Sequence, residues 1–139
     1  MKGGSYMSKG TSGHFGGTKG ANKVLIDELV SNGEKCTPDN IVAITKDSSG
    51  KIIWLETGTK KAGLKHIIEE HGSQFHGKGI SNDEIPYYIM EAIRQGNIVG
   101  YQGKNNPRTI YEFIYKGRKQ RVAISISPNG FIVGANPKH

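Results

Sequence analysis

The chain has 139 residues, the size of one domain with an ordinary hydrophobic core. It carries 19 Lys and Arg against 12 Asp and Glu, and the resulting net charge of +7 favours a polyanionic partner, either nucleic acid or an acidic protein. The single cysteine, Cys36, excludes an intramolecular disulfide and a cysteine-based zinc site, and no apolar run approaches the roughly 18 residues of a membrane span.

Residues 1–20 are predicted to form a flexible, glycine-rich linker. Seven of them are glycine and almost none is aliphatic, so the segment cannot bury enough apolar surface to offset its ordering entropy. It also lacks the apolar stretch of a secretory signal peptide. The segment is either an expression leader or the tail of a longer parent chain, and we expect one folded domain over residues 21–139.

The first half of that domain reads as a helix, a hairpin and a second helix. Apolar spacing predicts a helix over 21–32, and two β-branched runs, 41–45 and 52–55, flank a turn and predict a hairpin. A second apolar stripe predicts a helix over 60–71, ended by Gly72 and followed by a glycine-rich loop to residue 79.

The second half reads as one helix and a meander of strands. Ser81 and Glu84 have the spacing of a capping box, which predicts the start of a helix that Gly96 ends. Four strands are expected after it, over residues 98–101, 109–115, 121–127 and 130–135. Helices followed by an antiparallel meander predict an α+β fold, with the N-terminal helices packed on one face of a twisted antiparallel β-sheet.

Basic residues concentrate where this sheet is expected. No acidic residue follows Glu112, and cations from the second helix and the meander could neutralise phosphates. The candidate RNA-binding residues are Lys60, Lys61, Lys65, Lys104, Arg108 and Arg121. The alternative is a solvated basic face with no ligand.

Three histidines, His66, His71 and His76, are candidates for acid–base chemistry. His66 and His71 are five residues apart, roughly 140° around a helix, so they do not chelate one ion and no metal site is predicted. Two histidines could instead share the proton transfers of RNA cleavage, one at the 2′-hydroxyl and one at the leaving 5′-oxygen. Alternatively, His71 is a core residue, His66 is simply exposed, and His76 has either role in its loop.

Three further polar residues are candidates. Thr109 and Tyr111 are two apart on a predicted strand and share a face, where their hydroxyls beside Arg108 could hold a scissile phosphate; the alternative is an ordinary strand. Asn136 follows the last strand and is either a strand terminator or a site residue at the sheet edge. Cys36 has no base beside it in sequence and is interpreted as structural.

Four stretches of this sequence resemble the C-terminal toxin domains of bacterial polymorphic toxins. They are GLKHIIEEHG at 63–72, GIS at 79–81 with the helix after it, TIYE at 109–112 and GFIVGANP at 130–137. The nearest group is the CdiA-type contact-dependent growth inhibition toxins with tRNase activity, within the barnase/EndoU/colicin/RelE-like ribonucleases. The resemblance covers residues 21–137.

The resemblance implies the fold of that ribonuclease group and cleavage of RNA, above all tRNA, without a metal, leaving a 2′,3′-cyclic phosphate. The catalytic residues that it implies are His66, His71, Thr109, Tyr111 and Asn136. Lys65-His66 matches the lysine–histidine pair of colicin-like members, and Thr109-x-Tyr111 matches the pair of EndoU-like members.

The resemblance also implies partners and a place of action. No cofactor is expected, although some members use elongation factor Tu as a protein cofactor. A cognate immunity protein would neutralise the toxin. The domain would be secreted as the C-terminal part of a larger effector and act in the cytoplasm of the target cell. The alternatives are a non-catalytic, basic RNA-binding module and a protein-interaction module.

Overall fold

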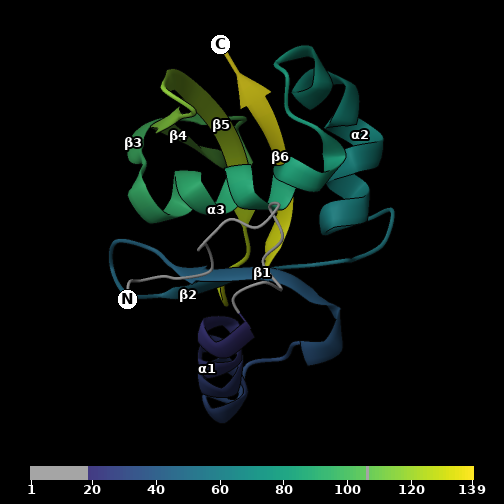
Figure 1. Ribbon diagram of the computed structural model, residues 1–139, viewed down its shortest axis with the longest axis vertical. Coiled ribbons are helices and arrows are strands. Elements are labelled where there is room, and N and C mark those ends of the chain that lie inside the picture. Colours follow the sequence, from purple (N-terminus) through teal and green to yellow (C-terminus); the bar gives the residue numbers. More distant parts are fainter. Residues whose placement is uncertain (1–18, 106) are drawn as a thin grey trace.

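The computed structural model describes residues 19–105 and 107–139 and has an α+β fold (Figure 1). The predicted linker lies outside the described residues up to position 18, and the first helix already begins at Lys19. Within the described residues, no helix is both long and apolar enough to cross a membrane. The helices are α1 (Lys19–Ser31), η2 (Pro38–Asn40), α2 (Leu64–Gly77), η3 (Asn82–Glu84) and α3 (Ile85–Gln95).

The strands form two separate antiparallel sheets. The predicted hairpin and the predicted meander are both confirmed, as a two-stranded sheet and a four-stranded sheet in the order β3-β4-β5-β6. The main-chain N–H of Trp54 donates to the Gly130 carbonyl at 3.0 Å and so joins the hairpin to the larger sheet. The strands are β1 (Ile41–Lys46), β2 (Ile52–Glu56), β3 (Asn97–Gln102), β4 (Arg108–Tyr115), β5 (Arg118–Ile126) and β6 (Ile132–Lys138).

The helices take three different positions around these sheets. In Figure 1, α3 lies across one face of the four-stranded sheet, α2 lies beside β6, and α1 lies on the far side of the hairpin. The core contains the buried face of α3, including Tyr88, and the β4 aromatics Tyr111 and Phe113. The expectation that the first helix also packs on the sheet is wrong: Leu29 of α1 clusters with Trp54 of the hairpin instead.

The second helix begins and ends later than predicted. Gly63, at φ +94°, precedes it, and its N–H donates to the Val133 carbonyl of β6 at 3.0 Å. Gly72 does not end the helix; it lies buried within α2, where a Cβ would meet the Ile68 side chain at an ordinary contact distance of 3.5 Å. The helix continues to Gly77, so His76 lies on it rather than in a glycine-rich loop.

The predicted start of the third helix is confirmed. Ser81 and Glu84 form the capping box, with the Ser81 N–H donating to the Glu84 carboxylate at 3.1 Å. A short 3-10 turn comes first, and α3 then continues to Gln95, where Gly96 follows as predicted.

Candidate functional site

The four-stranded sheet has one face covered by α3 and an opposite face, here called the outer face. Side chains alternate along a strand, so the buried Tyr111 points toward α3 and its neighbour Ile110 points to the outer face. Ile110 pairs with Ala123, which pairs with Asn136. Asn136 therefore belongs to the outer face, and it lies within β6, not after the last strand as predicted.

Three polar side chains meet on the outer face, and we call them the Arg108 cluster: Gln102, Arg108 and Asn136. The Arg108 guanidinium donates from Nη1 to Asn136 Oδ1 at 2.8 Å. Gln102 Nε2 donates to the same oxygen at 3.1 Å, and Asn136 Nδ2 donates back to Gln102 Oε1 at 3.3 Å. The cluster thus links β3, β4 and β6.

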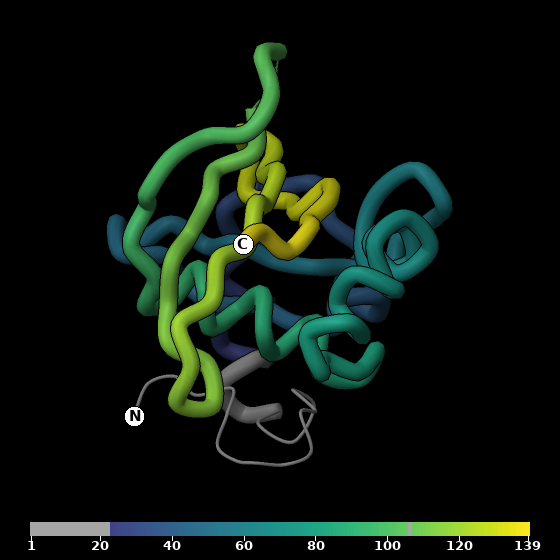
Figure 2. The backbone as a smooth tube through the Cα atoms, turned by 90° about the horizontal axis from the view of Figure 1, so that it is seen from above, coloured from purple at the N-terminus to yellow at the C-terminus, as the bar shows by residue number. Residues whose placement is uncertain are grey.

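The Arg108 cluster shows that the outer face is concave. Gln102 and Asn136 lie on strands separated by two others, a distance of about 14 Å in a flat sheet and more than the two side chains can span. Their hydrogen bonds require the sheet to curl, and Figure 2 shows β3 and the start of β4 curving around toward the yellow β6. The curl also explains why Ala123, on the outer face, is fully buried.

Arg108 is a half-buried cation without a carboxylate partner among residues 19–105 and 107–139. Burial lowers the pKa of its guanidinium, yet an arginine stays charged in proteins. Gly134 allows this packing, because a Cβ at that position would lie 2.7 Å from Arg108 Nη2. A buried charge is normally paired, so the uncompensated guanidinium is suited to bind an anion.

The other predicted RNA-binding residues do not belong to this cluster. Lys104, in the β3–β4 turn, is exposed, and Arg121 on β5 is held by Glu112 at 2.7 Å. Lys60 and Lys61 are exposed in the segment before α2, and Lys65 is exposed in its first turn. All five remain predictions as phosphate contacts.

The structure gives each of the three histidines a different partner. His66 Nδ1 lies 2.8 Å from the Lys60 carbonyl and so carries the proton that it donates. In the neutral ring, Nε2 is then left as a proton acceptor. His71 Nδ1 donates to Gln74 Oε1 at 2.7 Å, which leaves its Nε2 in the same state.

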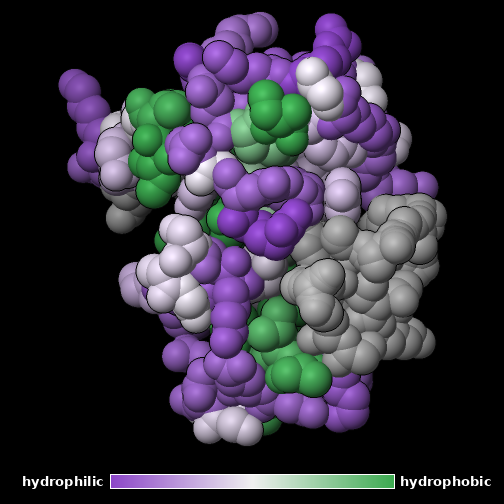
Figure 3. Space-filling view, turned by 60° about the vertical axis from the view of Figure 1, so that its left-hand side comes forward, coloured by the Kyte–Doolittle hydropathy of each residue, from purple (hydrophilic) through white to green (hydrophobic). Residues whose placement is uncertain are grey.

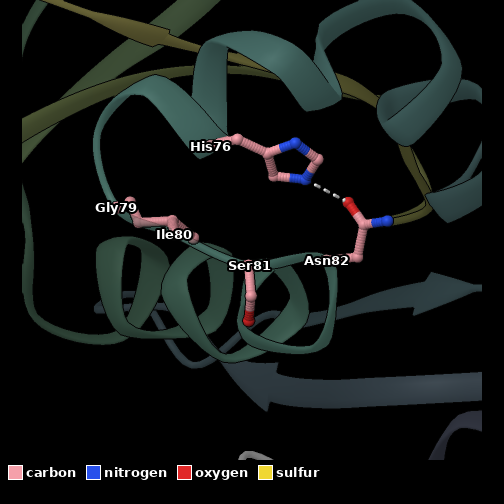
Figure 4. Close-up of a pocket in the computed structure, with 5 residues that line it drawn as sticks. All are labelled: His76, Gly79, Ile80, Ser81 and Asn82. Atoms are coloured by element: carbon pink, nitrogen blue, oxygen red, sulfur yellow. Dashed lines mark hydrogen bonds between the residues drawn. The ribbon is translucent and has the colours of Figure 1, made fainter.

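His76 lies apart, at the other end of α2. Its Nε2 donates to Asn82 Oδ1 at 2.7 Å, and the two residues line a pocket of about 360 Å³ with Gly79, Ile80 and Ser81 (Figure 4). The Ser81 hydroxyl points away from the imidazole in this view, and it donates to Glu84 at 3.3 Å. The pocket therefore contains no histidine-activated serine.

The five predicted catalytic residues lie in three places. His66 and His71 are on α2, and Asn136 is on the outer face. Thr109 and Tyr111 do share a face, as predicted, but it is the face toward α3, where Tyr111 is only 9% exposed and burial raises its pKa. The structure does not bring this hydroxyl pair together with Arg108, so the predicted joint phosphate contact is wrong in geometry.

One member of the cluster, Gln102, was not predicted. The signal that could have found it is the β3–β4 hairpin itself, because antiparallel pairing sets Gln102 opposite Arg108.

Comparison with known proteins adds no further assignment: no protein-family model matches the chain, and no curated protein is significantly similar to it. In the described part of the chain, no three His, Cys, Asp or Glu side chains gather in a way that could hold a metal ion.

Proposed function

We propose that this chain is the ribonuclease domain of an antibacterial toxin and that RNA binds on the outer face of its four-stranded sheet. The observation that carries the proposal is the half-buried Arg108 guanidinium, which is held by the neutral Asn136 amide and has no carboxylate partner in the described chain. A phosphodiester supplies the missing negative charge, and its two non-bridging oxygens match the fork of arginine donors.

The proposed chemistry is a transesterification. A histidine takes the proton from the 2′-hydroxyl, the 2′-oxygen bonds to phosphorus, and the 5′-oxygen leaves with a proton from a second group. Arg108 stabilises the charge on the non-bridging oxygens. The products are a 2′,3′-cyclic phosphate and a 5′-hydroxyl.

His66 is the proposed base, and His71, as the imidazolium, is the proposed group that protonates the leaving 5′-oxygen. The tautomer of His66 is compatible with this role, because a ring that donates from Nδ1 to the Lys60 carbonyl has Nε2 available to accept a proton. His71 has the same tautomer, so the order of the two roles is part of the proposal. The start of α2 also adjoins the sheet: Gly63 is hydrogen-bonded to Val133, the residue before Gly134.

The remaining parts of the proposal rest on the sequence resemblance. They are tRNA as the RNA class, elongation factor Tu as an accessory protein, an immunity protein that blocks the site, and delivery into the cytoplasm of a target cell within a larger secreted effector. The net charge of +7 is suited to an acidic inhibitor as well as to RNA.

The first test is cleavage of total bacterial RNA by the purified chain in EDTA, with and without elongation factor Tu. We expect discrete tRNA fragments that end in a cyclic phosphate. Bound but intact RNA would contradict the enzyme proposal and favour the non-catalytic RNA-binding module.

The second test compares Arg108→Gln with Arg118→Gln, a matched control at an exposed arginine beside the β4–β5 turn. Losing a charged hydrogen-bond donor at the site should weaken RNA binding by roughly 10- to 100-fold, whereas the control should change it little. His66→Ala should abolish cleavage and keep binding, with His76→Ala as its control. Equal losses from both arginine variants would show a diffuse basic surface instead of a site.

A further inference from the structure

The Asn136 side chain is held in one orientation by hydrogen bonds on both of its atoms. Oδ1 accepts from Arg108 and Gln102, while Nδ2 donates to Gln102 and, at 3.3 Å, to the carbonyl of Pro137. Of the two terminal groups of the Asn136 amide, only the NH₂ group can donate to a carbonyl. The Pro137 contact therefore agrees with an amide oxygen that faces Arg108. Gln102 is the side chain that bonds both ends of this amide.

The orientation of Asn136 decides where the Arg108 guanidinium lies. When its oxygen faces Arg108, Asn136 accepts a hydrogen bond from Nη1, and Nη2 lies next to Gly134. A rotated Asn136 amide would direct N–H groups at the cation and release it. The other N–H groups of Arg108 keep a fixed direction only while hydrogen bonds from Gln102 hold the Asn136 amide in this orientation.

We propose that Gln102 is a positioning residue for phosphodiester binding, acting on Arg108 through Asn136. The inference rests on the proposed function of the outer face, and it assigns to Gln102 no contact with the RNA.

The test measures the affinity of the intact chain for a 2′-deoxydinucleotide by NMR titration. This probe has one phosphodiester and lacks the attacking hydroxyl, so it binds without being cleaved. Gln102→Met keeps the length of the side chain and removes both amide contacts. We expect its Kd to rise about 5- to 10-fold, the effect of losing hydrogen bonds that hold a charged group. Asn97→Leu, an exposed amide at the other end of β3, is the matched control and should keep the wild-type Kd.

A double-mutant cycle separates positioning from a general structural role. In an Arg108→Gln background, Gln102→Met should raise the Kd no further, because the group that it positions is gone. Gln102→Leu serves as a second variant if the methionine lowers the melting temperature into the range of the titration. A wild-type Kd in both variants, or an equal rise with and without Arg108, would overturn the inference.

The same experiment distinguishes failure of the inference from failure of the proposed function. If Arg108→Gln weakens binding and Gln102→Met does not, the anion site stands and Gln102 has no positioning role. If the wild-type chain does not bind the dinucleotide, both proposals fall.

Discussion

The two faces of strand β4 differ although the same eight residues build both. Toward α3, the Tyr88 ring contacts Phe113 and Tyr115, each with ring centroids 4.9 Å apart in a T-shaped arrangement. On the outer face, Arg108 is fixed by an amide and Glu112 by an arginine. Alternation therefore lets one strand carry an apolar layer and a polar site.

The difference between these faces separates stability from function. The α3 face is closed by apolar and aromatic side chains, whose burial stabilises the fold. The outer face instead keeps a half-buried cation among neutral partners, which opposes folding unless a ligand supplies the opposite charge. On the face seen in Figure 3, the apolar patches of the described residues are small and separated by hydrophilic side chains.

Phe113→Ala should have the largest effect of any change to β4. Phe113 is 4% exposed and packs in the main core, so the variant should lose about 3–5 kcal/mol of unfolding free energy through lost burial and the cavity left behind. Urea denaturation measures the loss. A cost below about 1 kcal/mol would mean that α3 does not close this face as described.

The sequence was sufficient to predict the elements and the order of the strands, since capping, glycine turns and apolar period are local signals. Ser81 and Glu84 marked the start of a helix correctly. Gly72 led to a wrong prediction, because a glycine inside a helix gives the same local signal as one that ends it, and α2 continues to Gly77.

The site was only partly predictable for a related reason. The basic meander pointed to Arg108, but Thr109 and Tyr111 were grouped with it because they are close in sequence, although neighbouring residues of a strand point to opposite faces. The partnership of Gln102 with Asn136, 34 residues away, arises from the curl of the sheet and has no local signal.

Glu84, which accepts a hydrogen bond from Tyr115 of the α3 face, should have an intermediate and pH-dependent effect on the unfolding free energy. Burial disfavours the ionised Glu84 carboxyl, but hydrogen bonds from Lys116 and Tyr115 outweigh it and lower its pKa to about 2. An unfolded glutamate titrates near 4.3, so this stabilisation is present above about pH 4.3 and is lost as the pH falls toward 2.

Glu84→Gln should therefore lower the unfolding free energy at pH 7 by about 1.5–3 kcal/mol, the range for hydrogen bonds to a charged group. The difference from wild type should shrink as the pH is lowered toward 2, measured by thermal denaturation across that range. A difference that is constant with pH would exclude the ionised carboxylate as its source.

Ile114→Ser should have the smallest effect, although Ile114 is adjacent to Phe113 in sequence. Its side chain points to the outer face and is 59% exposed, so folding buries little of its apolar surface. We expect a change in unfolding free energy within about 0.5 kcal/mol, as for surface positions in general. The dinucleotide Kd should also stay at the wild-type value, because Ile114 lies beyond Glu112 on β4 and six residues from Arg108. A large loss of stability would show that the outer face is covered at this end, and the contrast between the two faces would then apply only near the Arg108 cluster.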